Sequence, residues 1–157
     1  MVSAEVLKRF GIFKGLDEPQ LAKIGELCHE RTRSKEAVCF YQGTKAKELH
    51  LCQSGRVSIF VVAGNVEIKI HTAKSGDTFG WSSLVEPYVY TASAKCLEEV
   101  KEIYLWRTDL LELFSKEPSI GYLVMTNLCS VISNRRNDVT DKLTRIIVAV
   151  AESQREN

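Results

Sequence analysis

The sequence predicts a mainly β fold, a double-stranded β-helix of the jelly-roll or β-roll type, flanked by N-terminal helices and a long C-terminal helix. Three observations predict this order: a capped helical segment near the start, short alternating apolar segments in the middle, and an apolar stripe at helical spacing towards the end. With 157 residues, 45% of them hydrophobic and 26% charged, the chain suits one globular domain. We expect a single domain over 1–157, with N-terminal helices in 1–30, the β-roll in 31–106 and C-terminal helices in 107–157.

The first 30 residues contain two helical segments. Residues 4–10 form a short turn with an apolar face, which Gly11 ends. A longer helix begins at Asp17, which caps the first turn together with Gln20, and Pro19 lies where a missing N–H costs nothing. The apolar face that this helix buries consists of Leu21, Ile24, Leu27 and Cys28.

Between Arg31 and Trp106 the apolar pattern changes from helical to alternating. Short segments rich in β-branched and aromatic residues follow one another at roughly 8–12-residue spacing, with turns such as Ser54-Gly55 and Gly64-Asn65 between them. The expected strands span 37–41, 48–52, 56–62, 66–71, 91–96 and 100–106. This pattern is typical of a sandwich or barrel, and we interpret it as a β-roll.

Helical spacing returns after Arg107. One helix runs to about Pro118, and a long one from Ser119 onwards carries an apolar stripe that a polar stretch at 134–138 interrupts. The stripe consists of Leu128, Ile132, Val139, Leu143, Ile146 and Val150. It packs either on the chain's own roll or on a second copy. We favour a homodimer through this helix, because a long terminal helix with no sequence after it has few partners in its own chain.

The charge of the chain argues against nucleic acid as a direct partner. With 21 Lys and Arg against 20 Asp and Glu the formal charge is +1, so no global positive field attracts a polyanion. The last helix mixes both signs, as on a solvated face: Arg135, Arg136 and Arg145 lie among Asp138, Asp141 and Glu152. We expect no direct DNA binding and no helix-turn-helix domain, because the chain ends at Asn157.

Several other classes of protein find little support. No apolar run approaches the roughly 20 residues that cross a bilayer, and the N-terminus lacks a secretory pattern, so we expect a cytoplasmic protein without a membrane association. No catalytic motif is present, and we expect no enzyme. His50 and Cys52 share a strand face but lack further ligands at a recognisable spacing, so no metal site is predicted.

The cysteines leave one alternative function open. Five of them are spread along the chain without a CxxC pair: Cys28, Cys39, Cys52, Cys96 and Cys129. This spacing favours buried or inert thiols over a disulfide framework or a metal cage. The alternative is a redox sensor that acts through Cys52 or Cys96.

Three segments resemble the cyclic-nucleotide-binding domains of catabolite-activator (Crp) and Fnr regulators, cyclic-nucleotide-dependent kinases and gated channels. Residues 10–28, FGIFKGLDEPQLAKIGELC, are similar to the family's entry segment, and residues 48–59, ELHLCQSGRVSI, to a strand pair with Gly at its turn. Gly76-Asp-Thr-Phe-Gly, followed by Ser83-Leu84 and Thr91-Ala92, is similar to the phosphate-binding cassette. The resemblance covers nearly the whole chain and implies a stand-alone domain of this type.

The resemblance also implies a ligand site, in which two charged side chains are missing. In the family a short helix after the Phe-Gly pair presents backbone N–H groups to the cyclic phosphate, a Glu holds the ribose hydroxyl, and an Arg pairs with the phosphate. Here the Glu position is Trp81 and the Arg position is Tyr90. Losing both contacts costs about 3–6 kcal/mol, roughly two to four decades in affinity. We expect no tight binding of cAMP or cGMP by these contacts.

The ligand-binding residues that the resemblance implies are Phe79, Gly80, Trp81, Ser82, Ser83, Leu84, Tyr90 and Thr91. Their aromatic rings either line a pocket for a cyclic nucleotide or another small planar ligand, or fill that pocket as core. The first case predicts a regulatory sensor in signal transduction, which passes ligand binding on to the long helix. The second predicts a protein-interaction or dimerisation scaffold with a protein partner. No resident cofactor is predicted.

Overall fold

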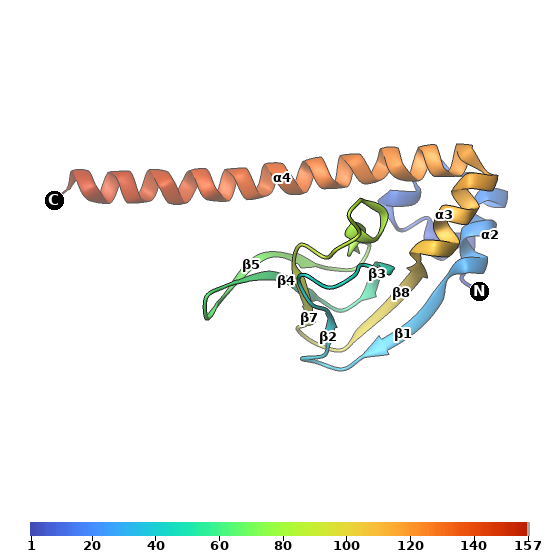
Figure 1. Cartoon of the computed structure of the whole chain (residues 1–157), viewed down its shortest axis with the longest axis horizontal. Coiled ribbons are helices and arrows are strands. Elements are labelled where there is room, and N and C mark those ends of the chain that lie inside the picture. Colours follow the sequence, from blue (N-terminus) through green and yellow to red (C-terminus); the bar gives the residue numbers. More distant parts are fainter. Residues whose placement is uncertain (157) are drawn as a thin grey trace.

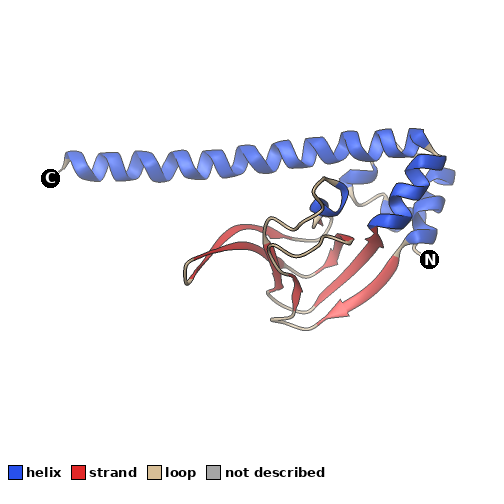
Figure 2. Cartoon of the chain, in the orientation of Figure 1, coloured by secondary structure: helices blue, strands red, loops and turns tan. Residues whose placement is uncertain are grey.

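The computed structural model describes residues 1–156 as two facing β-sheets with short helices gathered at one end (Figure 1; Figure 2). Before the sheets come α1 (Ala4–Leu7), the 3-10 helix η1 (Gly11–Phe13) and α2 (Glu18–Leu27). The strands are β1 (His29–Arg33), β2 (Val38–Phe40), β3 (Glu48–Ser54), β4 (Val57–Ala63), β5 (Val66–Ala73), β6 (Thr78–Phe79), β7 (Ser93–Cys96) and β8 (Val100–Trp106), with the 3-10 helix η2 (Trp81–Leu84) after β6. The chain continues with α3 (Arg107–Lys116) and α4 (Pro118–Arg155). The predicted fold class is confirmed.

The two sheets have the strand orders β1-β8-β3-β6 and β2-β7-β4-β5, and all of these neighbours are antiparallel. The chain passes from one sheet to the other several times, which makes the pair a roll. A small apolar core lies in the roll: Cys52, Val57, Ala73, Phe79, Ala94, Cys96 and Val100. Because Phe79 belongs to this core, the segment that follows it is anchored to the roll.

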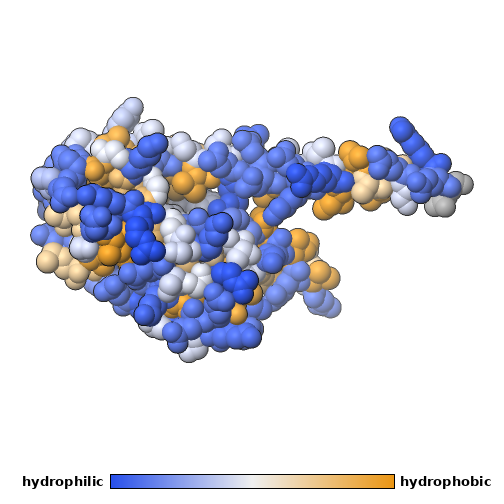
Figure 3. Space-filling model, turned by 180° about the vertical axis from the view of Figure 1, so that it is seen from behind, coloured by the Kyte–Doolittle hydropathy of each residue, from blue (hydrophilic) through white to orange (hydrophobic). Residues whose placement is uncertain are grey.

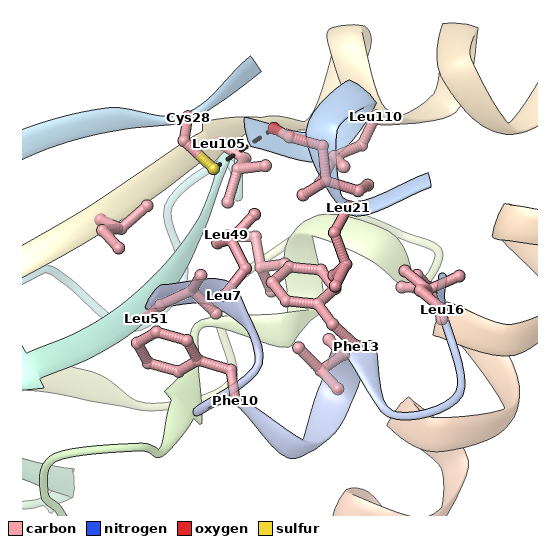
Figure 4. Packing of buried hydrophobic residues seen from close by; sticks show 14 of the residues in the cluster. Leu7, Phe10, Phe13, Leu16, Leu21, Cys28, Leu49, Leu51, Leu105 and Leu110 are labelled. Atoms are coloured by element: carbon pink, nitrogen blue, oxygen red, sulfur yellow. Dashed lines mark hydrogen bonds between the residues drawn. The ribbon is translucent and has the colours of Figure 1, made fainter. Parts of the chain in front are cut away.

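A larger apolar core joins the roll to the helices (Figure 4). Leu7 and Phe10 from the N-terminal segment and Leu21 from α2 pack in one cluster with Leu105 of β8 and Leu110 of α3. Each of these side chains is at most 1% exposed. A fully buried leucine contributes about 1.5–3 kcal/mol to stability, so this cluster fixes the helical end of the molecule firmly to the roll.

Helix α2 begins with the capping box that the sequence predicts. The backbone N–H of Asp17 donates to the Gln20 side chain, and the N–H of Gln20 donates to the Asp17 carboxylate, both at 2.9 Å. Pro19 lies in the first turn, as expected. After the helix, the Cys28 thiol donates to the Ile24 carbonyl at 3.3 Å, and burial raises the pKa of Cys28 to about 12 (Figure 4). Cys28 is thus a protonated, structural thiol.

Strand β1 was not among the expected strands, and the helical region therefore ends earlier than residue 30. Its sequence, His-Glu-Arg-Thr-Arg, has no apolar residue, so it shows no alternation to recognise. It pairs with β8 in a register that sets His29 opposite Tyr104 and Arg33 opposite Val100. Ion pairs of its arginines with Glu102 take the place of apolar contacts. The two-residue strand β6 was too short to be predicted.

Helix α4 is continuous for 38 residues, about 57 Å at 1.5 Å per residue, and Pro118 begins it instead of ending α3. The polar stretch at 134–138 does not interrupt it. Its first third packs on the domain, and a Cβ added at Gly121 would lie 2.8 Å from the Cβ of Phe114, so a larger residue there would push α3 and α4 apart.

Beyond the roll, α4 projects away from the rest of the described chain (Figure 1). Leu128 of the predicted stripe is 1% exposed, but Leu143 is 56% and Ile146 61% exposed. Figure 3 shows hydrophobic residues gathered on this projecting part of the helix. The stripe therefore packs on the chain's own domain only at Leu128 and Ile132, and its other four residues are exposed. No helix among residues 1–156 is long and apolar enough to cross a membrane.

Candidate ligand pocket

A pocket of about 170 Å³ lies between the roll, the segment after β6, and α4. Its lining residues are Phe40, Ile59, Ile70, His71, Phe79, Gly80, Trp81, Ser82, Tyr90, Thr91, Ala92 and Arg135. Six of the eight expected ligand residues are among them: Phe79, Gly80, Trp81, Ser82, Tyr90 and Thr91. The other two, Ser83 and Leu84, lie outside the pocket with 0% and 5% exposure.

The turn at Gly80 gives the pocket its shape. Gly80 has φ +70°, a left-handed conformation that favours glycine, and it precedes the 3-10 helix η2. A Cβ at this position would lie only 2.7 Å from the His50 ring. The Ser83 hydroxyl donates back to the Gly80 carbonyl at 3.0 Å and closes the turn. The left-handed turn at Gly80 thus directs the next two residues, Trp81 and Ser82, to the pocket.

Tyr90 stands at the sequence position where the resemblance expects an arginine. Its ring is 5% exposed and stacks on Phe40 with 3.8 Å between the ring centroids. Its hydroxyl donates to the Glu48 carbonyl at 2.9 Å. Burial raises the pKa of Tyr90 to about 12, so the group remains neutral. Tyr90 therefore gives the pocket an aromatic wall without a charge.

A buried ionic network lies behind Tyr90. Glu102 of β8 has no exposed surface and accepts hydrogen bonds from Arg31 and Arg33 at 2.5 and 2.8 Å. His50 Nδ1 lies 3.2 Å from the other oxygen of Glu102, and His50 Nε2 lies 3.4 Å from the Tyr90 hydroxyl. Burial alone would raise the pKa of Glu102, but His50 and the two arginines outweigh it and lower this pKa to about 2. The network fixes the wall that Tyr90 forms.

Trp81 and Arg135 form the side of the pocket towards α4. Trp81 is half-buried and packs partly against the helical core. The guanidinium carbon of Arg135 lies 5.3 Å from the centroid of the Trp81 ring, within the range of a cation–π contact. Tyr90 and Trp81 both line the pocket, and their side chains leave a space of about 170 Å³ open.

Arg135 was expected on a solvated helix face, and this expectation was wrong. The side chain is half-buried and lines the pocket, whereas its neighbour Arg136 is exposed. Burial lowers the pKa of Arg135, and the charges of Asp77 and Asp138 oppose this effect. The sequence could have indicated this burial. Arg135 follows Leu128 by seven residues, about two helical turns, and therefore lies on the same face of α4 as this buried residue.

His71 is a second polar group at the pocket that sequence reasoning missed. Its Nε2 atom is buried without a hydrogen-bond partner among the residues that the structure describes. The nearest carboxylate oxygen, Oδ2 of Asp77, is 3.7 Å away and accepts the backbone N–H of Lys74 at 3.0 Å. Burial would raise the pKa of Asp77, but the contacts with His71 and Lys74 and the charge of Arg135 lower it. His71 Nε2 therefore makes no hydrogen bond in the described chain, although it lies within ion-pair distance of Asp77.

Two cysteines on neighbouring strands lie close together in the roll. The sulfur atoms of Cys39 and Cys96 are 3.8 Å apart, and burial raises the pKa of both thiols. Burial likewise raises the pKa of Cys52 to about 12. In the part of the chain that the structure describes, no group of three or more His, Cys, Asp or Glu residues is arranged to hold a metal ion.

Comparison with known proteins identifies the family of the chain. The sequence pattern of the cyclic nucleotide-binding domain matches residues 30–117, and the chain belongs to this family. It is 28% identical over 130 residues to the cyclic AMP receptor protein of Thermus thermophilus, covering 82% of this chain and 58% of that protein. It is 25% identical over 138 residues to a CRP-like cAMP-activated global transcriptional regulator of Mycobacterium tuberculosis, covering 87% and 62%.

Solved structures agree on the fold. A cyclic nucleotide-binding domain from Methylobacillus flagellatus superposes with a TM-score of 0.80 at 16% identity, over 90% of this chain and 80% of that one. The chain spans about three fifths of the length of the two curated relatives.

Proposed function

We propose that this chain is a non-enzymatic sensor domain, whose pocket binds a small molecule other than a cyclic nucleotide held by the usual Glu and Arg contacts. The observation that supports this most is the pocket of about 170 Å³ that persists between the roll and α4 although Tyr90 and Trp81 occupy the charged positions. Pockets for drug-sized ligands measure about 300–1,000 Å³, so a smaller ligand than cAMP suits this space. Its largely aromatic and aliphatic walls suit a flat, mainly apolar molecule.

A ligand in the pocket would contact α4 directly. Arg135 lines the pocket from this helix, and a few residues later the Lys142 ammonium donates to the Ile70 carbonyl of β5 at 3.3 Å. A ligand that contacts both the roll and Arg135 stabilises one position of α4 relative to the roll, which is how a differential contact shifts a conformational equilibrium.

The projecting half of α4 is the proposed interface with a second copy of the chain. Its exposed apolar side chains are Val139, Leu143, Ile146, Ile147, Val148 and Val150, each between 39% and 61% exposed. Val139, Leu143, Ile146 and Val150 share one face of the helix, and pairing two identical helices along this face removes these side chains from water in both chains. A homodimer through α4 would connect the ligand pocket to the output of the domain.

The test of the sensor function is a thermal-shift titration of the unmodified protein with cAMP, cGMP, cyclic dinucleotides and small planar metabolites. A ligand at a hundredfold excess over its dissociation constant stabilises the fold by about 2.7 kcal/mol, a shift of several degrees at this size. Ala92→Phe should abolish the shift because it fills the pocket, whereas Ala63→Phe on the exposed end of β4 should not. No shift with any compound would favour a scaffold with a protein partner instead.

A redox sensor is a second candidate, because Cys39 and Cys96 lie 3.8 Å apart. Two thiols would lose two electrons and two protons to a peroxide, which becomes two water molecules, and the sulfur atoms would approach to about 2.05 Å. The raised pKa values of both thiols disfavour the reactive thiolate, so we expect this reaction to be slow. Mass spectrometry after peroxide treatment would detect the disulfide, and Cys96→Ser should prevent it.

A further inference from the structure

Arg135 makes no direct ion pair in the described chain, although the charges of Asp77 and Asp138 act on it from a longer distance. No carboxylate among residues 1–156 lies within ion-pair distance of its guanidinium group, although the side chain is half-buried. Its guanidinium group makes a cation–π contact with the Trp81 ring. A buried cation is costly unless an anion or hydrogen-bond acceptors compensate it. Arg135 therefore has donors free to bind a negatively charged group at the pocket.

The rest of the pocket suits one flat ring. Phe40 and Tyr90 stack on each other with 8° between their planes and form one aromatic wall, and Ile59 and Ile70 add aliphatic surface. A cavity of about 150 Å³ in another protein accommodates one benzene ring. The present volume of about 170 Å³ thus holds a single six-membered ring with a short polar substituent.

We propose that the ligand is a small aromatic carboxylate with one ring. The ring lies among the aromatic and aliphatic walls, and the carboxylate accepts hydrogen bonds from the Arg135 guanidinium. His71 Nε2, which is buried and makes no hydrogen bond in the described chain, is a second donor when it carries the proton. The proposal rests on the sensor function proposed above and adds the chemical class of the ligand and the residue from α4 that recognises it.

The negative charge of Asp77 opposes such a ligand but does not block it. Asp77 is not among the residues that line the pocket, and its Oδ2 atom is engaged by the Lys74 N–H. Its charge is felt by Arg135 and lowers the gain from binding a carboxylate. Removing this charge with Asp77→Asn, which keeps an oxygen for the Lys74 N–H, should therefore strengthen the binding of an anionic ligand.

The experiment compares charged and neutral ligands of the same shape. Benzoate and phenylacetate are titrated against benzamide and phenylacetamide by isothermal titration calorimetry on the full chain. The fluorescence of Trp81 in a Trp106→Phe background gives an independent signal from the pocket wall. Arg135→Gln is the test variant, and Arg136→Gln is its matched control, because it removes the same charge from an exposed neighbouring position.

We expect the carboxylates to bind more tightly than the amides, and Arg135→Gln to weaken the carboxylates by about tenfold to a hundredfold while the amides change little. Arg136→Gln should leave both unchanged. Equal binding of carboxylates and amides, with no effect of Arg135→Gln, would overturn the anionic ligand and leave the sensor function intact. If none of the four compounds binds, the proposal of a single-ring ligand is wrong. The thermal-shift titration with the wider metabolite panel tests the sensor function separately.

Discussion

Replacing Glu102 with Gln tests the ionic network behind the pocket. Glu102 is fully buried and lies within hydrogen-bond distance of Arg31, Arg33 and His50, so the substitution removes the one carboxylate that they share. Breaking a buried ion pair by removing one partner costs about 3–5 kcal/mol. The pKa of Glu102 gives a similar figure: a drop from 4.5 to about 2 corresponds to about 3 kcal/mol of folding stability.

The sign of the pH dependence follows from the direction of this shift. Because the pKa of Glu102 is lower in the folded than in the unfolded chain, its contribution to stability is complete above about pH 4.5 and is lost as the pH falls towards 2. Urea unfolding of wild type and Glu102→Gln, measured across this range, should therefore differ by about 3 kcal/mol near neutral pH and converge in acid. The control is Glu98→Gln, whose ion pair with Arg56 is exposed and worth less than about 1 kcal/mol.

Two results would refute this reasoning. A loss of less than about 1 kcal/mol at neutral pH would show that the arginines find other partners or water at little cost. A difference between wild type and Glu102→Gln that does not shrink in acid would show that the lowered pKa of Glu102 is not the source of the stability. Either result would leave Tyr90 without the rigid support that we assign to it.

Three further predictions concern the pocket and α4. Gly80→Ala should destabilise the fold by about 2–4 kcal/mol in urea unfolding, from the left-handed backbone and the contact with the His50 ring, and an unchanged midpoint would contradict this. Trp81→Glu with Tyr90→Arg should create cAMP affinity measurable by calorimetry, and no gain would mean that the pocket's shape has diverged as well. Leu143→Glu should give a monomer by analytical ultracentrifugation, and a wild type that is already monomeric would rule out the α4 interface.

Much of the fold could be predicted because local and tertiary requirements coincide. The Asp17–Gln20 capping box and the turns between strands are local signals, and the structure contains them where the sequence predicts them. Strand β1 was missed because its stability comes from Glu102, which lies 69 residues after Arg33. An ion pair between distant residues leaves no periodic pattern in either segment.

Only one part of the pocket lining, the segment after β6, could be predicted from the sequence. The segment from Phe79 to Thr91 is continuous in sequence, and a resemblance was enough to find it. The other lining residues come from four separate elements: Phe40 from β2, Ile59 from β4, Ile70 and His71 from β5, and Arg135 from α4. Only the roll and the course of α4 bring these residues together, and the charge of Arg135 suggested solvent exposure when it was considered alone.

Helix α4 carries a pocket residue and the proposed dimer interface on one unbroken element. If a ligand at Arg135 makes dimerisation more favourable by some factor, then thermodynamic reciprocity requires that dimerisation raise the affinity for the ligand by the same factor. The apparent dissociation constant would then depend on how concentrated the protein is. A titration in dilute solution would report a weaker ligand than one at high protein concentration, and this difference would itself measure the coupling between the two ends of the helix.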